Sequence, residues 1–318
     1  MRKSLIALII FAIGGFILYQ PTAAYAQATR TWISGVGDDA NPCSRTAPCK
    51  TWAGAISKTS PAGEIDNLDA GGFGAVTITK SITLDGSTGG QGGVLVAGTN
   101  GIVVAAGSND VVILKNIEFA GLLGNGTGSG FGLSGIAFNS GAALIIENCA
   151  IVGFANNGIA ISPSTNSKVV IRRTRITNTA TATGNAAILI NPTANVNVTI
   201  NNSSMESQLN GIFATGSSII HVQVRDSVIT NSTNNGVTFN AANGNADVIN
   251  TLISYSNNDG AVAGAGTLTL GGDTITNNVT GVATAGGTLL SFKNNQITDN
   301  GTNGTPITAV TGNSGTLQ

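Results

Sequence analysis

Charged side chains are scarce in this sequence. Lysine, arginine, aspartate and glutamate make up 9% of the 318 residues, with 14 basic against 15 acidic residues and a formal charge of -1. A weakly acidic chain lacks the positive surface that attracts nucleic acids and anionic membranes. The composition therefore argues against both as partners.

Residues that commonly carry catalysis are also few. The chain has one histidine, His221, for which we expect a structural role, and it shows no Ser-His-Asp set, phosphate-binding loop or zinc motif. Glycoside hydrolysis needs paired carboxylates, and Ca2+ needs several oxygen ligands together. Glu118, Glu147, Asp226 and Asp247 instead lie in separate segments. We therefore expect no metal site and no cofactor.

The one long apolar run lies at the N-terminus. A basic start precedes apolar residues 5–18, and Ala-Tyr-Ala at 24–26 has the small-x-small form of a cleavage site. This order is typical of a secretory signal peptide, and the run is short for a membrane span. A retained single-pass anchor is the alternative. We expect a secreted or periplasmic chain with no membrane span after cleavage.

A short phrase recurs between residues 111 and 297. It consists of apolar residues two apart, a turn residue that is usually Asn, and an apolar residue three positions further on. The copies end 22–32 residues apart, a period typical of stacked-coil proteins. In one register, the last residues of the copies are Phe119, Ile151, Ile176, Met205, Ile229, Ile253, Ile275 and Ile297.

Each phrase predicts short strands separated by bends. Apolar spacing of two indicates a strand with one buried face, and the turn residues tolerate a left-handed backbone. A Gly-apolar step such as Gly158-Ile159 is expected to supply the next bend and a third strand. Such strands become stable only when coils pair at about 4.8 Å, so we predict a solenoid. The register residues are Leu114, Ile146, Ile171, Ile200, Val224, Val248, Leu270 and Phe292, and the turn residues are Asn116, Asn148, Arg173, Asn202, Asp226, Asn250, Gly272 and Asn294.

This pattern resembles the right-handed parallel β-helix, or pectin-lyase-like, superfamily. The N-terminal part is also similar to the opening of many secreted members, with a G-x-D-x-N-P turn at 37–42, a helix-starting phrase at 48–56 and a K-S-I-T-L-x-G strand at 80–86. The resemblance implies an all-β, right-handed parallel β-helix solenoid with a short N-terminal capping helix. Its handedness comes from the resemblance alone.

The expected cap has two further features. A first coil exposes an unpaired edge that needs a cover, and Trp52 and Ile56, four residues apart, are expected to point at that coil. Cys43 and Cys49 flank a Pro-rich turn after a signal peptide, so we predict a disulfide. Cys149 is expected to be a small filler beside the turn residues.

These features divide the chain into four parts. They are a signal peptide at 1–26, an N-terminal cap with the disulfide at 27–62, a parallel β-helix at 63–305 and a C-terminal tail at 306–318.

The one concentration of charge in the predicted stack is basic, with Arg172, Arg173 and Arg175 in one phrase and Arg225 and Asp226 two coils on. One interpretation is a solvated ladder whose charges pair between coils, each pair contributing roughly 0–1 kcal/mol. The other is a basic groove that holds carboxylates of an acidic glycan through bidentate arginine contacts. The expected ladder is Lys115, Glu147, Arg172, Asn201 and Arg225.

We therefore favour a secreted, non-catalytic scaffold that binds polysaccharide or a cell-surface glycan. Enzymes of the resembled superfamily cleave polyuronides or glycosides, so the alternative is a polysaccharide lyase or glycoside hydrolase acting on an acidic polysaccharide. Ca2+ is expected as a cofactor only if the lyase alternative holds. Three or more carboxylates beside residues 172–175 would favour the enzyme. An unbroken neutral surface there would favour the binding scaffold. Outward threonines do not line up between coils, which argues against ice binding.

Overall fold

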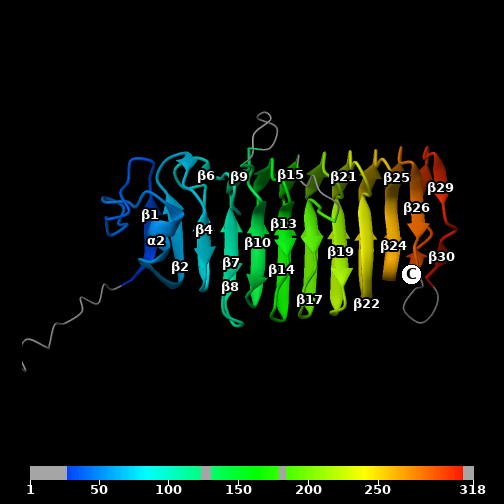
Figure 1. The fold of residues 1–318 in the computed structure, drawn as a ribbon, viewed down its shortest axis with the longest axis horizontal. Coiled ribbons are helices and arrows are strands. Elements are labelled where there is room, and N and C mark those ends of the chain that lie inside the picture. Colours follow the sequence, from blue (N-terminus) through cyan, green and yellow to red (C-terminus); the bar gives the residue numbers. More distant parts are fainter. Residues whose placement is uncertain (1–26, 123–129, 178, 180–183, 311–318) are drawn as a thin grey trace, which may run out of the picture.

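The computed structural model describes residues 27–122, 130–177, 179 and 184–310 as an elongated stack of coils (Figure 1). Strands lie across the long axis, and the stack runs from the N-terminal end to the C-terminal end. The predicted signal peptide lies outside the described residues. Within the described part, no helix is long and apolar enough to cross a membrane.

Each coil contributes strands to three parallel faces, which we call A, B and C. Because β22 (Val237–Ile249) and β24 (Asp259–Gly271) run through both A and B, these two faces form one 20-stranded sheet, whereas face C is a 10-stranded sheet. Face A also contains β1 (Ala28–Ile33), β2 (Thr59–Asn67), β5 (Ile82–Asp85), β8 (Val111–Lys115), β11 (Ala143–Glu147), β14 (Ser167–Arg172), β17 (Val196–Asn201), β20 (Ile220–Arg225), β27 (Thr288–Ser291) and β30 (Thr308–Ala309). Face B also contains β4 (Val76–Ile78), β7 (Ile102–Ala105), β10 (Ser134–Ser140), β13 (Asn157–Ile161), β16 (Ile188–Ile190), β19 (Ile212–Gly216), β26 (Thr280–Thr284) and β29 (Thr302–Gly304). Face C contains β3 (Gly71–Gly72), β6 (Gly92–Leu95), β9 (Glu118–Ala120), β12 (Ala150–Val152), β15 (Arg175–Thr177), β18 (Ser204–Glu206), β21 (Val228–Thr230), β23 (Leu252–Ser254), β25 (Thr274–Thr276) and β28 (Gln296–Thr298).

Face C carries the predicted interior column. Neighbouring members lie directly opposite each other in parallel register, and all but the last are at most 1% exposed. Burial of each aliphatic side chain stabilises the stack by about 1.5–3 kcal/mol. The predicted column is therefore confirmed. It runs through Phe119, Ile151, Ile176, Met205, Ile229, Ile253, Ile275 and Ile297.

The bend between faces A and C has a left-handed residue in each of these coils. The predicted turn residues from Asn116 to Gly272 all have φ between 48° and 67°. The last coil is an exception, because Leu270 lies opposite Ser291 rather than the expected Phe292. Lys293, with φ 67°, then takes the bend in place of Asn294. The predicted register was wrong by one residue in this coil, because six positions separate Ser291 from Ile297 where five separate Leu270 from Ile275. A slip of one residue moves a strand residue to the opposite face of the sheet.

A buried polar ladder follows this bend. The Ser203 N–H donates to the Ser227 hydroxyl at 3.3 Å, and the Thr251 N–H donates to the Asp273 carboxylate at 2.8 Å. These side chains satisfy backbone groups that the bend removes from the sheet, and a buried polar group without a partner is costly. Cys149 occupies the same position one coil before Thr174, and burial raises the pKa of its thiol to about 12. It is an interior filler rather than a reactive thiolate.

The glycines just before or near the start of the face B strands make room for the Ile column. A Cβ on Gly236 would lie 2.5 Å from Cγ2 of Ile253 and 2.6 Å from the carbonyl oxygen of Gly260. Gly236 does not have a positive φ. The Gly-apolar steps are thus explained by close packing rather than by backbone freedom.

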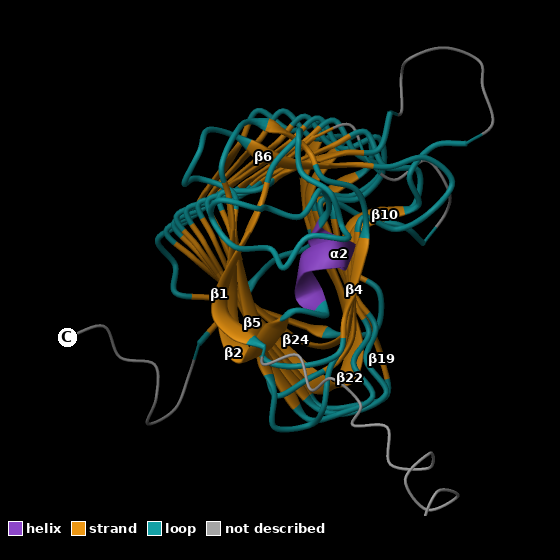
Figure 2. Cartoon of the chain, turned by 90° about the vertical axis from the view of Figure 1, so that its left-hand side faces the viewer, coloured by secondary structure: helices purple, strands orange, loops and turns teal. Residues whose placement is uncertain are grey.

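Helix α2 (Trp52–Ile56) covers the N-terminal end of the stack, as Figure 2 shows in the view along the axis. The Thr51 hydroxyl caps it by accepting the Gly54 N–H at 2.9 Å. Trp52 is fully buried, contacts Phe73 edge to face at 5.7 Å and donates to the Gly93 carbonyl at 3.2 Å. Ile56 packs on the core while partly exposed. The capping helix is therefore present where the resemblance placed it.

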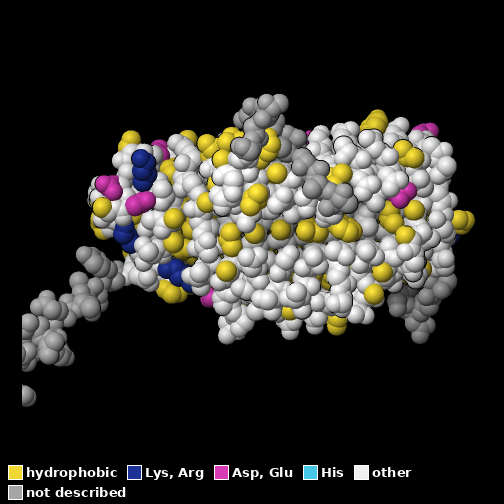
Figure 3. Space-filling model, in the orientation of Figure 1, with side chains coloured by type: hydrophobic (Ala, Val, Ile, Leu, Met, Phe, Trp, Pro, Cys, Tyr) yellow, Lys and Arg dark blue, Asp and Glu magenta, His cyan; other side chains and the backbone are white. Residues whose placement is uncertain are grey.

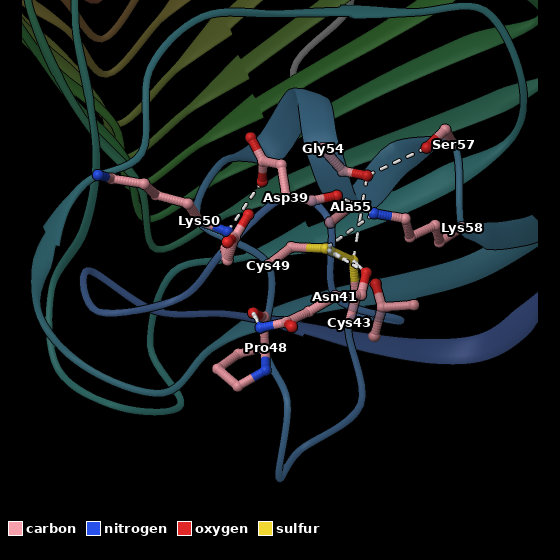
Figure 4. Close-up of a disulfide and its surroundings, with 12 residues drawn as sticks. Asp39, Asn41, Cys43, Pro48, Cys49, Lys50, Gly54, Ala55, Ser57 and Lys58 are labelled. Atoms are coloured by element: carbon pink, nitrogen blue, oxygen red, sulfur yellow. Dashed lines mark hydrogen bonds between the residues drawn. A yellow bond between two sulfur atoms is a disulfide. The ribbon is translucent and has the colours of Figure 1, made fainter.

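Cys43 and Cys49 form the predicted disulfide beside this helix (Figure 4). The same loop is held by Asp39, whose carboxylate accepts the N–H groups of Lys50 and Thr51 at 2.8 and 2.9 Å. The cap is thus fixed by one covalent bond and by hydrogen bonds to its backbone.

Two expected boundaries fall inside regular structure. β2 spans the expected junction between residues 62 and 63, and β30 lies within 306–318, where we expected a tail. Leu290 of β27 lies opposite Thr308 of β30 in parallel register. Pairing with the preceding coil satisfies backbone groups that an unattached tail would leave to solvent, so the stack continues into this segment. Residues 311–318 lie outside the described part.

We predict that Gly236→Ala destabilises the protein by about 1–3 kcal/mol, because the added methyl group overpacks the interior. Urea unfolding of the mature chain measures this. Gly71→Ala is the matched control on face C, because its Cβ would meet Phe73 at 3.5 Å, an ordinary contact, and its effect should stay within about 0.5 kcal/mol. A Gly236→Ala protein as stable as the wild type would contradict the packing argument.

A second prediction concerns Asp273, which is fully buried. Burial raises its pKa from 3.8 to about 7, against the lowering effect of hydrogen bonds from Thr251 and Gly271. A raised folded-state pKa means that this contribution to stability is full below about pH 4 and is lost as the pH rises through 7. Asp273→Asn removes the ionisation but turns an NH2 group toward the Gly271 N–H, so it should be less stable than wild type at pH 5.

Between pH 5 and pH 8, the Tm of Asp273→Asn should rise relative to that of the wild type. Calorimetry at both pH values gives this difference, from which ionisations common to both proteins cancel. A difference that stays constant with pH would show that Asp273 ionisation does not affect stability.

Candidate functional site

The three predicted arginines surround one bend. Arg172 ends β14, Arg173 occupies the bend with φ 50°, and Arg175 begins β15. Arg173 therefore stands where neighbouring coils have Asn148 and Asn202. Because these residues lie outside the packed interior, the side chains of Arg172 and Arg173 remain 44% and 55% exposed.

One acidic residue faces this group. Arg172 Nη2 lies 2.8 Å from Glu147 Oε2, and Arg173 Nη2 pairs with Oε1 of the same carboxylate. Arg175 contacts the Thr177 hydroxyl at 3.4 Å and has no acidic partner among the described residues. Two guanidinium groups thus share the Glu147 carboxylate and the third has none, so these four residues together carry a formal charge of +2.

An open groove of about 490 Å³ lies beside these arginines. Its walls combine two guanidinium groups with amides and a hydroxyl, which are the groups that bind carboxylates and sugar hydroxyls. The Asn148 amide donates to the Asn116 side chain at 2.7 Å, so these walls are tied together. The polar lining includes Ser87, Gln91, Asn116, Asn148, Arg173 and Arg175.

Arg225 lies in the same ladder as Arg172, and Asp226 lies in the same turn column as Arg173, but both are outside this groove. Asn201 of β17 separates Arg172 from Arg225, so the two arginines are roughly 10 Å apart at about 4.8 Å per coil. Asp226, with φ 51°, accepts a hydrogen bond from the Asn250 amide. The structure therefore does not bring all five predicted residues together.

The charge ladder is present in register, but Lys115 pairs differently from our expectation. Lys115 lies opposite Glu147, yet its amine is 3.0 Å from Asp85 and 3.6 Å from Glu64. Arg30 contacts Glu64 and also lies 3.2 Å from Asp66. Three carboxylates therefore converge in the first coils around Arg30 and Lys115, not around the Arg172 group.

The carboxylates Asp66 and Asp85 have opposite pKa shifts. Burial, followed by the charge of Glu64, raises the pKa of Asp66 to about 6, against the lowering effect of Arg30. Burial also acts to raise the pKa of Asp85, but hydrogen bonds from Asn116, Lys115 and Ser87 hold it below its usual value. Because Asn116 and Ser87 line the groove, Asp85 lies directly behind its wall.

Sequence reasoning missed this acidic group. Asp66 lies opposite Asp85, which lies opposite Lys115, so both belong to the predicted ladder. Extending the register upstream through Leu84 and Ile65 would have found them. Their strands fell instead in the segment that we interpreted by its resemblance alone.

Other candidate groups add little to the site. His221 pairs with Asn245 on the next coil, in line with a structural role. Among the described residues, no three His, Cys, Asp or Glu side chains are arranged to hold a metal ion. The ligand set that Ca2+ requires is thus not found in this part of the chain.

Face B carries a different surface. Figure 3 shows a row of apolar side chains along this face, with the charged side chains of this view mostly at the N-terminal end. Leu189 lies opposite Ala160 and Phe213 within that face. The arginine groove at the bend between faces A and C therefore offers an acidic ligand a better surface than face B.

Comparisons with known proteins agree with this architecture. A family model described as "Right handed beta helix region" matches residues 186–317. No curated protein matches the chain. Pectate lyase Pel9A is 12% identical, with a TM-score of 0.53 over 86% of this chain and 80% of that one. A rhamnogalacturonan lyase is 11% identical, with a TM-score of 0.51 over 82% and 75%. At such identities the likeness concerns the fold alone, and with the parallel sheets it shows that this chain is a right-handed parallel β-helix.

Proposed function

We propose that this chain is a secreted or periplasmic binding protein, and that the groove beside Arg173 and Arg175 holds a carboxylated polysaccharide. The observation that carries the proposal is the surplus of positive charge at an open, polar groove. The N-terminal segment supports export from the cytoplasm, because its composition is that of a signal peptide.

The chemistry of the groove suits uronate residues. Arg175 has no acidic partner among the described residues, and Arg173 shares Glu147 with Arg172. A guanidinium group presents five N–H donors, so Arg173 retains donors for a second carboxylate. Charge-assisted contacts of this kind are the strong ones, while the amides of Gln91 and Asn148 are suited to sugar hydroxyls.

The comparisons support a carbohydrate partner without identifying it. The two solved structures of this fold carry the names of lyases for pectate and rhamnogalacturonan. Their low identity leaves the ligand of this chain to be argued from its own residues. The excess of arginine over carboxylate at the groove favours an acidic glycan over a neutral one.

We predict that Arg173→Asn together with Arg175→Asn weakens binding of polygalacturonate at least about 10-fold at low salt, because two charge-assisted contacts are lost. Asparagine already occupies the Arg173 position in neighbouring coils, so the variant should fold. Isothermal titration of the mature chain measures the affinity.

Arg225→Asn is the matched control, because it removes the same charge outside the groove and should change the affinity less than about twofold. No binding of polygalacturonate by the wild type would overturn the proposal. An unchanged affinity of the double variant would also overturn it.

The alternative is cleavage of the acidic polysaccharide, and one observation favours it. Asp66 has a pKa of about 6 while neighbouring Asp85 has a lowered pKa, and such divided values are typical of acid and base pairs. However, Asp66 is 2% exposed, and Arg30 and Lys115 already pair with the acidic group.

We therefore predict that the purified chain releases neither unsaturated nor reducing ends from polygalacturonate, with or without Ca2+. Absorbance of unsaturated products and a reducing-end assay test this. Release that is strongest below about pH 6 and is abolished by Asp66→Asn would establish the enzyme instead.

A further inference from the structure

Tyr255 exposes an aromatic ring far from the arginine groove. It follows β23 in the bend between faces C and B, and it is 57% exposed. Among the described residues it is the one aromatic residue that is largely exposed. Its hydroxyl makes no hydrogen bond within this described part. An exposed ring with a polar tip offers a ligand an apolar face and a hydrogen-bonding group together.

The backbone at Tyr255 is unfavourable for so large a side chain. Its φ is 56°, in a column where five other described coils have the left-handed residues Gly153, Ser207, Asn231, Asn277 and Asp299. Small or amide residues tolerate this left-handed conformation, whereas a bulky residue there is an outlier. Residues strained in this way cluster at functional sites, although Leu122 and Lys293 also have a positive φ in this chain. The positive φ of so large a residue thus distinguishes Tyr255 independently of the exposure of its side chain.

The ring borders a shallow hollow of about 610 Å³. Asn231 and Asn277 occupy the same column position on the preceding and following coils, and both are exposed. Val279, which is 56% exposed, adds a second apolar contact. Apart from the phenol of Tyr255, the lining residues contain no ionisable side chain.

We propose that this hollow binds a neutral sugar ring of an oligosaccharide. The C–H face of a pyranose stacks on the Tyr255 ring, and the Asn231 and Asn277 amides bond its hydroxyls from the two sides. A few convergent polar groups around an apolar surface are the ordinary composition of a small-ligand site. Asp299 follows Asn277 in the column and repels a carboxylate, so an acidic sugar is disfavoured.

The hollow is separate from the arginine groove. Arg173 lies in the bend before face C, and Tyr255 lies in the bend after it. Three coil steps separate Ile176 from Ile253, roughly 14 Å along the axis at about 4.8 Å per coil. The two sites therefore differ in position, charge and class of sugar, and either can exist without the other.

The test uses titration calorimetry of the mature chain with cellohexaose, xylohexaose, mannohexaose and β-1,4-galactohexaose, each up to 10 mM. At least one should bind wild type and Tyr255→Phe with affinities within about threefold of each other. Tyr255→Asn, which places the residue of both neighbouring coils at this position, should weaken that binding at least about 10-fold. Its Tm should be equal to or higher than that of the wild type, because the strain is relieved.

Two results would overturn the proposal. One is that none of the four hexasaccharides binds the wild type at 10 mM. The other is that Tyr255→Asn binds as well as the wild type. Polygalacturonate binding should be the same in wild type and Tyr255→Asn, which separates failure at this hollow from failure at the arginine groove.

Discussion

The structure depends on like residues lying opposite each other along the stack. Parallel pairing places each residue beside its counterpart in the coils before and after, as at Ile176, Met205 and Ile229. No coil can bury its strands alone, so this register carries both the packing and the backbone hydrogen bonds. An interior side chain that does not fit its column therefore disturbs the packing of the coils on both sides of it.

The bends show how closely successive coils keep the same register. Left-handed residues recur at the same place in successive coils, and the side chains that follow them satisfy the freed backbone groups of adjacent coils. The interior consequently accommodates hydroxyls and even the Asp273 carboxylate where they lie beside backbone partners in the adjacent coil. Repetition thus allows polar groups in a core that would otherwise exclude them.

Function, on our proposals, lies where a coil departs from its column. Arg173 and Tyr255 both occupy left-handed positions that asparagine fills in neighbouring coils. Such a position lies at a corner of the coil and directs its side chain away from the interior, so a new side chain there changes the surface without repacking the core. This explains how one regular scaffold can carry a cationic groove and a neutral hollow.

The repeat period and the apolar column could be read from the sequence, because a stack converts sequence spacing directly into spatial position. The resemblance of the N-terminal segment likewise located the helix at Trp52, and cysteine spacing located the disulfide. Only the tertiary structure decided which partner each long charged side chain contacts. Lys115 lies opposite both Glu147 and Asp85 and pairs with Asp85, because local charge and space decide between two partners that the register allows. It also decided the slip to Ser291, since an inserted residue leaves no periodic mark in the sequence, and it decided that Arg30 contacts both Glu64 and Asp66.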